Sequence, residues 1–577
     1  MRRWSSTGII RSSRSLRFAA PSPARAARRP LTLAALLLSA LLLGPLARSA
    51  PARAERRVVI FHTSDIHGYS KPRAVPWSEA PGRLIGGFEA LGAHLDAEEA
   101  PYLLLDSGDF FQGAPEGTLS RGRAIVELMN ASGYDAVAVG NHEYDFGEDN
   151  LKALARLARF PLLAANIQRA ADGAPAEYAR PWALFERGGV RVGVVGLATR
   201  FTSTATLPAH VAHLRFVDEV AAARPHVAAL RAAGADVVVA LTHCGVGPGV
   251  SRRRVDVSTY TPSEEDLHYP GDIEVARAAG VDLVLGGHAH AAFSALWAPP
   301  GGALIAQSGE QLEHVSRVVV RVPDGGGAPQ VEGRLVPLWA DALPAPRGER
   351  APGAGESLRA RLRSEVARLS SQVDAQMSAV VGEAAEPLPR FVDPPHLDGP
   401  LPNLFCDAMA RVAGADLALH NTFGFRSDLP RGPLTVGHLY QVMPFDNQLA
   451  VMSLTGAQLK RLLADNIEGG ASRLQVSRHL SLDVALSPTG ALAGAALRFE
   501  GAPIDEARVF RVAMNSYMAG GGSCCQALAA LPSTDTSIPL RVLFMDEVRA
   551  QSPLRAPATG RIRRVERLEE PAPAPIR

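Results

Sequence analysis

The 577-residue chain has few cysteines, and this scarcity excludes two common ways of stabilising a fold. Its four cysteines are too few and too irregularly spaced for a disulfide framework or a thiolate zinc site: Cys244, Cys406, Cys524 and Cys525. One disulfide in an oxidising compartment stays open, with its pairing undecided. The chain also lacks internal repeats, and 47% of its residues are hydrophobic. We therefore expect globular domains that are stabilised by packing.

Acidic residues are absent from the first 54 residues, which contain ten Arg. The remainder of the chain carries 50 basic and 58 acidic residues, so its formal charge is −8, although the whole chain has +2. An acidic folded part has no overall attraction for a phosphate backbone, which argues against a nucleic-acid polymer as partner.

The segment 1–54 itself predicts an export signal. An Arg-rich start precedes an apolar run from Leu31 to Leu46, and small residues follow up to Ala54. We predict cleavage after Ala54 and a periplasmic or secreted product without a stable membrane anchor. An uncleaved anchor is the alternative, although the apolar run is short for a bilayer span. An arginine pair at 28–29 leaves Sec and twin-arginine export both open.

Short apolar runs alternate with longer helix-like stretches from Arg57 to Val322, which is typical of a layered α/β domain. Strands are expected at 58–62, 102–106, 136–139, 162–165, 190–197, 237–242 and 283–285. Most of them are apolar at consecutive positions, so both faces of the sheets should be covered.

The chain divides into five expected parts: a signal at 1–54, the α/β domain at 55–343, a linker at 344–378, a second domain at 379–565 and a disordered tail at 566–577. The linker should contain a helix at 357–373, because that stretch has helical spacing and mixed charge. The second domain should have strands at 449–454, 481–484 and 510–514 and helices at 404–412 and 456–467.

Polar residues follow the apolar runs of the first domain where each run stops. They occur in FHTSDIHG, LLLDSGDFF, VAVGNHEYD, VVVALTHC and LVLGGHAH, and the metal-ligand candidates among them are Asp65, His67, Asp109, Asn141, His243, His288 and His290. Ligands of layered α/β proteins collect at the carboxyl ends of strands. Oxygen and imidazole donors without thiolate suit zinc, manganese, cobalt or iron. Cys244 follows His243 directly, but adjacent residues of an extended segment point to opposite sides, so we assign Cys244 to the core.

Each of these short motifs is weak alone, because Asp-x-His or His-x-His occurs by chance and a lone buried histidine is usually a core residue. Five such segments in order, each closing an apolar run, favour a shared site. Asp109 is the natural bridging carboxylate of a two-metal site, since it follows Gly108 in a tight loop.

The ordered blocks DIHG, GDFFQG, GNHEYD, THCG and GGHAH resemble those of calcineurin-like metallophosphoesterases, and within that superfamily the chain resembles the exported 5′-nucleotidase family. The resemblance implies a four-layer αββα domain followed by a smaller α+β substrate-binding domain. It also implies that Asp65, His67, Asp109 and His290 hold one ion and that Asp109, Asn141, His243 and His288 hold the other. By the same resemblance, His142 and Asp145 form a catalytic dyad.

Elementary chemistry agrees with this assignment. Two divalent ions lower the pKa of bound water and neutralise charge on phosphoryl oxygens during in-line attack. His142 is adjacent to Asn141 and is poorly placed for the same ion, so we assign it to the phosphoryl or leaving oxygen, with Asp145 orienting its ring. A structural role for His142 at a helix end is the alternative.

The segment from His420 to Gly456 resembles the substrate-binding part of the family's carboxyl domain. The resemblance implies that Asn421 and Arg426 contact the nucleotide and that Phe445 and Tyr517 clamp the base, although ordinary core packing explains either ring equally well. The sequence departs from the family pattern at several positions: Thr422, Phe423 and Phe425 replace a Gly-rich run, Ser523 replaces a ribose-binding Asp, and only Arg390 lies near an expected further Arg.

We therefore predict an exported dinuclear phosphohydrolase that cleaves the 5′-phosphate monoester of nucleotides. One alternative changes the substrate to a 2′,3′-cyclic nucleotide, a sugar phosphate, a nucleotide sugar or a sulfur ester. The other is a non-catalytic binding protein on the same scaffold.

Overall fold

The structure is a computed structural model, and it describes residues 56–75, 80, 82–247, 250, 254–324, 327–345, 356–392, 395–468, 471–487 and 491–568, without the side chains of residues 372, 468, 523 and 524. The predicted export signal and most of the predicted tail lie outside the described residues. The predicted replacement at Ser523 concerns a side chain that is also outside them.

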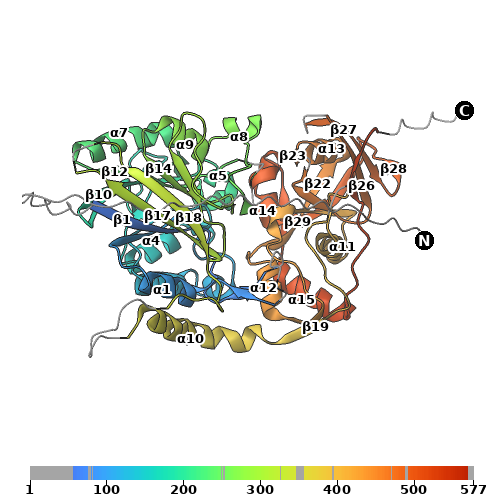
Figure 1. Ribbon diagram of the computed structural model, residues 1–577. Helices are drawn as coiled ribbons and strands as arrows, with labels where there is room; N and C mark the ends of the chain where they lie inside the picture. Colours follow the sequence, from blue (N-terminus) through green and yellow to red (C-terminus); the bar gives the residue numbers. More distant parts are fainter. Residues whose placement is uncertain are drawn as a thin grey trace, which may run out of the picture. The chain divides into compact units, whose positions relative to one another are not determined.

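Two sheets form the centre of the first domain (Figure 1). The first sheet has the order β18 (Gln330–Pro337), β17 (His314–Val322), β1 (Arg56–Thr63), β4 (Tyr102–Asp106), β5 (Ala136–Ala138), β6 (Leu162–Leu163) and β8 (Ala179–Arg180). The second has the order β16 (Leu304–Gln307), β14 (Leu283–Gly286), β12 (Val237–His243), β10 (Val190–Ala198) and β9 (Trp182–Arg187). Pairing is parallel from β1 to β8 and from β16 to β10, whereas β17, β18 and β9 are antiparallel additions.

Helices cover the outer face of each sheet, which gives the predicted four layers. Strand β1 illustrates the alternation, because Val58 and Ile60 pack in the core between the sheets whereas Val59 and Phe61 pack in the core under the helices. The helices on the first sheet are α1 (Phe88–Asp96), α3 (Arg123–Ser132) and α4 (Glu148–Leu157), and those on the second are α7 (Glu219–Ala232) and α9 (Asp272–Ala278). Burial on both faces explains the consecutive apolar residues of the strands.

The parallel strands end nearly level with one another. Thr63 at the end of β1 pairs with Asp106 at the end of β4, and Thr242 of β12 pairs with Gly286 at the end of β14. Every segment that follows these strands therefore starts at the same edge of its sheet. The candidate metal-ligating residues lie at or just beyond these ends.

The second domain contains a five-stranded sheet and a four-stranded sheet. The larger sheet has the order β25 (Leu474–Val476), β20 (Leu417–Asn421), β29 (Val509–Asn515), β22 (Gln448–Thr455) and β30 (Ser533–Pro539). The smaller has the order β28 (Ala502–Pro503), β27 (Leu492–Phe499), β26 (Leu480–Leu486) and β31 (Ile562–Val565). One core packs under α11 (Pro400–Ala413), α12 (Val436–Val442) and α15 (Leu540–Gln551), and a second packs α13 (Gly456–Ala464) with the smaller sheet. This arrangement is the expected α+β fold.

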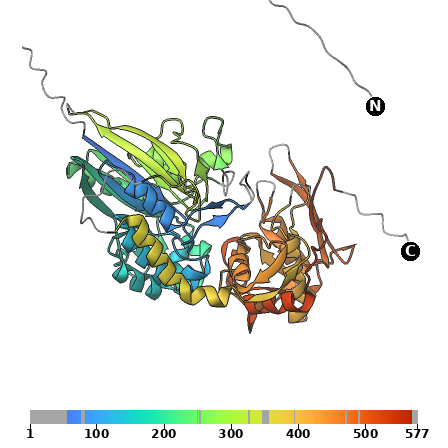
Figure 2. The same cartoon turned by 60° about the horizontal axis from the view of Figure 1, so that its bottom comes forward.

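Helix α10 (Leu358–Met377) occupies the predicted linker and extends four residues beyond the predicted end. The hydroxyl of Ser357 caps it by accepting a hydrogen bond from the Ala360 backbone N–H at 2.9 Å. Leu362 is fully buried in the core of the first sheet, and Figure 2 shows α10 lying along α1. The helix therefore packs on the first domain as part of its core.

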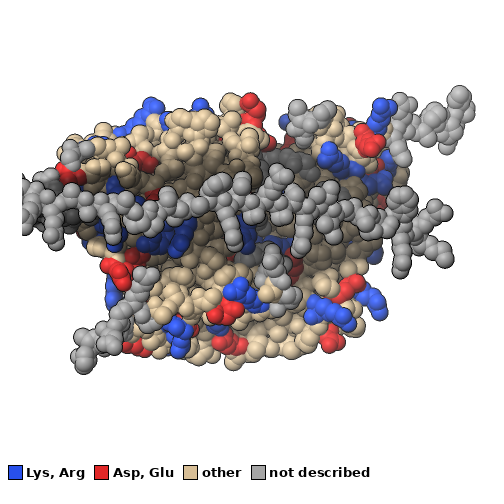
Figure 3. Space-filling view, viewed as in Figure 1, with Lys and Arg blue, Asp and Glu red and all other residues tan. Residues whose placement is uncertain are grey.

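Charged side chains of both signs are interspersed on the face of the described residues that Figure 3 shows. Among the described residues many charged side chains form ion pairs, for example Arg368 with Glu365 and with Glu127. Within the described part of the chain, no helix is both long and apolar enough to cross a membrane.

Candidate functional site

Five of the seven candidate metal ligands have a backbone conformation that side chains rarely adopt. Their φ angles are 52° for Asp65, 49° for His67, 55° for Asp109, 73° for His288 and 55° for His290. Left-handed backbone at non-glycine residues is strained and persists only where the surrounding structure enforces it, often at functional sites. The loops after β1, β4 and β14 thus hold these side chains in enforced positions.

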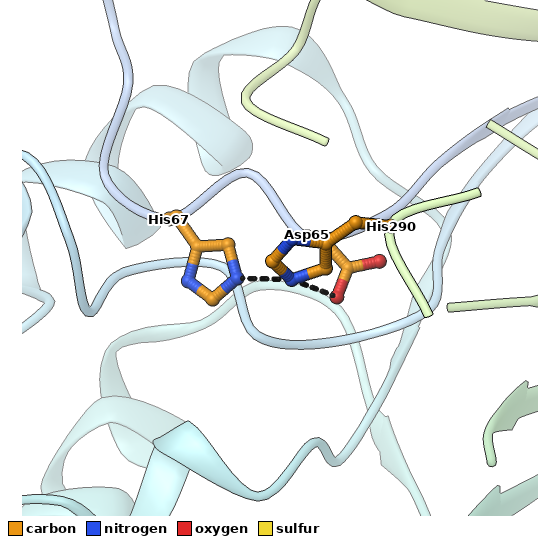
Figure 4. A group of neighbouring side chains, drawn as sticks. All are labelled: Asp65, His67 and His290. Atoms are coloured by element: carbon orange, nitrogen blue, oxygen red, sulfur yellow. Dashed lines mark hydrogen bonds and ion pairs between the residues drawn. The ribbon is translucent and has the colours of Figure 1, made fainter. Parts of the chain in front are cut away.

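One cluster consists of Asp65, His67 and His290, whose ligand atoms lie within 4.8 Å of one another (Figure 4). The His67 Nε2 and His290 Nε2 atoms are 2.9 Å apart, and His290 Nε2 is 3.5 Å from Asp65 Oδ1. Burial, followed by the charge of Arg426, holds the pKa of His67 well below its usual range, so its ring is neutral.

The other ring nitrogens of this cluster show which atoms carry protons. His67 Nδ1 lies 2.6 Å from the Gln112 carbonyl oxygen, which can only accept, and His290 Nδ1 lies 2.8 Å from a Glu310 carboxylate oxygen. Both Nδ1 atoms are therefore donors, so each ring in its neutral form presents the lone pair of its Nε2 atom. Two lone pairs facing each other beside a carboxylate form a donor set that fits a cation.

The second cluster consists of Asp109, His243 and His288, again with ligand atoms within 4.8 Å. His243 Nδ1 lies 2.7 Å from the Ser107 carbonyl oxygen, so His243 Nε2 faces Asp109 Oδ2 at 3.0 Å. Burial lowers the pKa of His243, but the Asp109 carboxylate overcomes this effect and raises it to about 10. This position therefore has a strong preference for positive charge.

Asn141 and Asp109 provide further oxygen atoms that could bind a cation. The Asn141 Oδ1 atom is buried and has no hydrogen-bond partner within the part of the chain that the structure describes. Asp109 belongs to the second cluster, and its charge also shifts the pKa of Asp65 and His67 in the first. A buried amide oxygen without a donor and two neighbouring groups of oxygen and nitrogen ligands fit divalent cations.

Glu143 fixes the loops that carry Asp109 and Asn141, and sequence reasoning missed it. Its fully buried carboxylate accepts hydrogen bonds from the backbone N–H groups of Asp109 at 2.9 Å, Phe110 at 3.0 Å and Gly140 at 2.7 Å. Burial and the nearby Asp109 carboxylate raise the pKa of Glu143 to about 8. The only signal in the sequence was its place in GNHEYD, directly after two assigned residues.

His142 and Asp145 contact each other as predicted, from the first residue of the 3-10 helix η1 (His142–Tyr144) and the residue directly after its end. His142 Nδ1 lies 2.7 Å from Asp145 Oδ2, and His142 Nε2 lies 3.9 Å from Asp109 Oδ2. Burial lowers the pKa of His142, but the carboxylates of Asp145 and Asp109 outweigh it and raise the pKa above its usual value. The imidazole can therefore be a proton donor beside the cation clusters.

A cavity of about 1060 Å³ adjoins this pair and is lined by residues of both domains. All four candidate substrate-binding residues line it, namely Asn421, Arg426, Phe445 and Tyr517.

These four residues also contact other parts of the protein. Arg426 Nη2 lies 3.1 Å from His67 Nε2, which places a guanidinium at the edge of the first cluster. Phe445 stacks on the His142 ring at a centroid distance of 5.7 Å. The Tyr517 hydroxyl donates a hydrogen bond to the Thr204 carbonyl at 2.7 Å, and Asn421 Oδ1 accepts one from Asn515 at 2.7 Å.

The two phenylalanines that depart from the family pattern have different surroundings. Phe425 is fully buried and packs against Phe405 and His420. Phe423 is 45% exposed and lines the cavity. Arg390 donates hydrogen bonds to Asp428 and to the Phe425 carbonyl oxygen, next to the same segment.

Cys244, in the first domain, lies in the core beneath the second sheet, as expected for a residue that is not a ligand.

The chain matches two protein families over most of its length. Residues 58–292 match the calcineurin-like phosphoesterase family, and residues 380–530 match the C-terminal domain of 5′-nucleotidase. Protein UshA of Yersinia enterocolitica is 26% identical over 518 residues, which cover 82% of this chain and 88% of that protein. A probable 5′-nucleotidase of Treponema pallidum is 26% identical over 538 residues, which cover 83% of this chain and 88% of that protein.

Solved structures show the same two-domain fold. A 5′-nucleotidase precursor from Thermus thermophilus superposes with a TM-score of 0.73 at 28% identity, over 89% of this chain and all of that one. The sulfate thiohydrolase SoxB from the same genus, at 20% identity and a TM-score of 0.70, shares the fold. Together with the clusters at the strand ends, these matches establish that the chain belongs to the 5′-nucleotidase family of calcineurin-like metallophosphoesterases and is a phosphoester hydrolase.

Proposed function

We propose that the protein is an exported hydrolase that uses two divalent cations to cleave the 5′-phosphate monoester of nucleotides. The observation that carries this proposal is the convergence of two buried cation-binding clusters, the His142–Asp145 pair and Arg426 on one cavity. Relatives named 5′-nucleotidase support the choice of a nucleotide. When bound, two cations would supply positive charge that stabilises the phosphoryl oxygens and acidifies the attacking water.

Residues of the chain would bind the cations, bind the phosphoryl group and donate a proton. One cation would be held by Asp65, His67, Asp109 and His290, and the other by Asp109, Asn141, His243 and His288. Arg426 would bind a phosphoryl oxygen, because its guanidinium reaches the first cluster and carries a fixed positive charge. His142 would donate a proton to the leaving oxygen from Nε2, while Asp145 holds Nδ1 and keeps the ring in orientation.

The nucleoside would occupy the part of the cavity between Phe445 and Tyr517, with Asn421 offering hydrogen bonds. Aromatic side chains suit any nucleobase, since stacking contributes on the order of 1 to 3 kcal/mol without selecting one base. The exposed ring of Phe423 favours a second candidate, a different phosphoester such as a 2′,3′-cyclic nucleotide, sugar phosphate or nucleotide sugar, because it alters the wall where the family has glycine.

Phosphate release from a substrate panel tests both candidates. Purified protein, loaded separately with zinc, manganese, cobalt or iron, is assayed with AMP, UDP-glucose, 2′,3′-cyclic AMP, glucose 6-phosphate and p-nitrophenyl phosphate. The proposal expects AMP to have the highest kcat/KM. Cleavage of p-nitrophenyl phosphate without cleavage of AMP would remove the nucleotidase assignment and leave the phosphohydrolase.

Two substitutions test the site itself. Asp109→Asn and His142→Ala should each lower kcat by about 10² to 10⁴ while the protein stays folded. His268→Ala is the matched control, because that side chain is 79% exposed on α8 (Glu264–His268) and should leave kcat unchanged. Near-normal turnover by both site variants would refute the site assignment.

Export is tested separately by expression of the full chain in a bacterial host. Edman sequencing of the accumulated protein should begin at Glu55. A product that keeps residues 1–54 and sediments with membranes would support the uncleaved anchor instead.

A further inference from the structure

The segment that follows β10 contacts η1 at several points. It comprises α5 (Thr202–Ala205), Thr206 and α6 (Pro208–Val211). The Ala205 carbonyl accepts a hydrogen bond from the Asn141 amide at 3.4 Å, and His210 Nδ1 lies 2.9 Å from the Tyr144 carbonyl oxygen. A segment that is distant in sequence thus contacts the residue directly before His142 and the residue directly before Asp145.

Thr206 provides the contact between these two anchor points. Its side chain is 2% exposed, and its hydroxyl donates a hydrogen bond to Asp145 Oδ1 at 2.9 Å. The other oxygen of the same carboxylate, Oδ2, lies 2.7 Å from His142 Nδ1. Among the described residues, Asp145 Oδ1 accepts a hydrogen bond from the Thr206 hydroxyl alone.

We propose that Thr206 is a positioning residue for the His142–Asp145 pair: its hydroxyl holds the Asp145 carboxylate so that Oδ2 stays directed at His142 Nδ1. This inference rests on the proposed function of that pair. A carboxylate bonded through one oxygen can rotate about its Cβ–Cγ bond, whereas bonds to both oxygens fix its plane. Because threonine is β-branched and has few χ1 rotamers, the hydroxyl direction is itself restricted.

The consequence concerns turnover more than substrate binding. Thr206 lies at the wall of the cavity, but it is only 2% exposed and its hydroxyl is bonded to Asp145, so we expect it to act on the substrate through Asp145 and His142. The imidazole acts on the leaving oxygen in the transition state. Loss of such a support should lower kcat and leave KM nearly unchanged. Partners that orient a functional group from outside typically change activity by about tenfold or more when removed.

The test compares Thr206→Val, which keeps the shape without the hydroxyl, with Thr206→Ser, which keeps the hydroxyl. With p-nitrophenyl phosphate as substrate, Thr206→Val should lower kcat about tenfold and change KM by less than about twofold. Thr206→Ser should keep most of the wild-type kcat. Thr206→Ala is a second hydroxyl-free variant with the same expected loss, should the valine variant fail to fold. Wild-type kcat in the folded hydroxyl-free variant overturns the proposal.

Thr202→Val is the matched control within the segment. Thr202 is fully buried and its hydroxyl donates to the Thr199 carbonyl at 2.8 Å, so its loss perturbs the same segment without touching Asp145. Its kcat should equal that of the wild type. An equal loss in Thr202→Val would assign the effect to segment packing and overturn the proposal.

A double-mutant cycle separates action through Asp145 from any other action. In an Asp145→Ala background, adding Thr206→Val should change the residual kcat by less than about twofold. A full tenfold loss in that background overturns the proposal. Failure of the proposed function has a different signature, because His142→Ala would then keep normal turnover whatever Thr206 does.

Discussion

The buried carboxylate of Asp272 makes the stability of the first domain depend on pH. Asp272 begins α9 and is fully buried. Its Oδ1 accepts a hydrogen bond from the Thr242 hydroxyl at 2.6 Å, and its Oδ2 accepts one from the Gln307 amide. Burial raises the pKa of Asp272 from 3.8 to about 7, despite these two bonds and the nearby His243.

The sign of the effect follows from proton counting. Between pH 3.8 and about 7 the carboxyl of the folded protein keeps its proton while that of the unfolded chain has lost it. The folded state binds more protons in this window, so the free energy of unfolding falls as the pH rises through it. At about 1.36 kcal/mol for each pH unit, the loss amounts to at most about 4 kcal/mol and is complete above about pH 7.

The Asp272→Asn variant should remove this loss. Its side-chain oxygen can still accept from Thr242, and its NH₂ group can donate to Gln307 after the Gln307 amide turns over. That rotation also serves the Gln307 Oε1 atom, which is buried without a hydrogen-bond partner among the described residues. We expect the variant to match the wild type near pH 4 and to exceed it at pH 8 by up to about 4 kcal/mol.

Urea unfolding followed by tryptophan fluorescence measures the difference at pH 4, 6, 7 and 8 in EDTA, which removes pH-dependent cation binding. Other buried acids, such as Asp106 with a pKa of about 7, titrate in both proteins and cancel in the difference. Asp149→Asn is the control, because that side chain is fully exposed and its replacement should change the free energy of unfolding by less than about 0.5 kcal/mol. A constant difference for Asp272→Asn, or a less stable variant at pH 8, would refute the reasoning.

Two further predictions concern buried supports. Glu143→Ala leaves three backbone N–H groups without their acceptor, so metal content after dialysis and kcat should each fall about 10 to 100-fold, measured by elemental analysis and phosphate release. Retained metal would show that the loops hold their shape without Glu143. Phe405→Ala removes a fully buried ring that stacks on Phe425 and Phe544 and should lower the free energy of unfolding by about 3 to 5 kcal/mol in urea titrations, with Phe405→Leu losing less. A loss below about 1 kcal/mol would contradict the packing argument.

Much of the fold was predictable from the spacing of apolar residues. All seven strands expected in the first domain are present, because strands buried on both faces need consecutive apolar residues. Less regular elements were not predicted, such as the hairpin β17–β18, where β18 alternates and is only half buried. The expected helix at 456–467 ends at Ala464, and residues from Ile467 form β23 (Ile467–Glu468). The apolar pattern continued past the helix end, whereas the residues there pair antiparallel with β24 (Ala471–Ser472).

The predicted ligand residues share a local signal, since each follows an apolar run, and the structure brings six of the seven together in two clusters. Glu143 has only its place in GNHEYD as a signal, and Thr206 has none. Glu143 bonds to backbone atoms up to 34 positions away, and Thr206 is separated from Asp145 by 61 positions. Glu143 binds backbone N–H groups and Thr206 binds a single carboxylate oxygen. Contacts of this kind do not produce a recognisable pattern of residue types in the sequence.

The amino-acid sequence by itself determined the layered architecture and the family and indicated the candidate ligand residues, because apolar periodicity and short polar motifs are local properties of a chain. Only the tertiary structure decided which nitrogen of His67, His243 and His290 faces the clusters, which side chains fix the loops, and that Phe425 is buried while Phe423 lines the cavity. The reason is physical: proton positions, backbone strain and side-chain direction are set by neighbours that folding brings from distant parts of the chain.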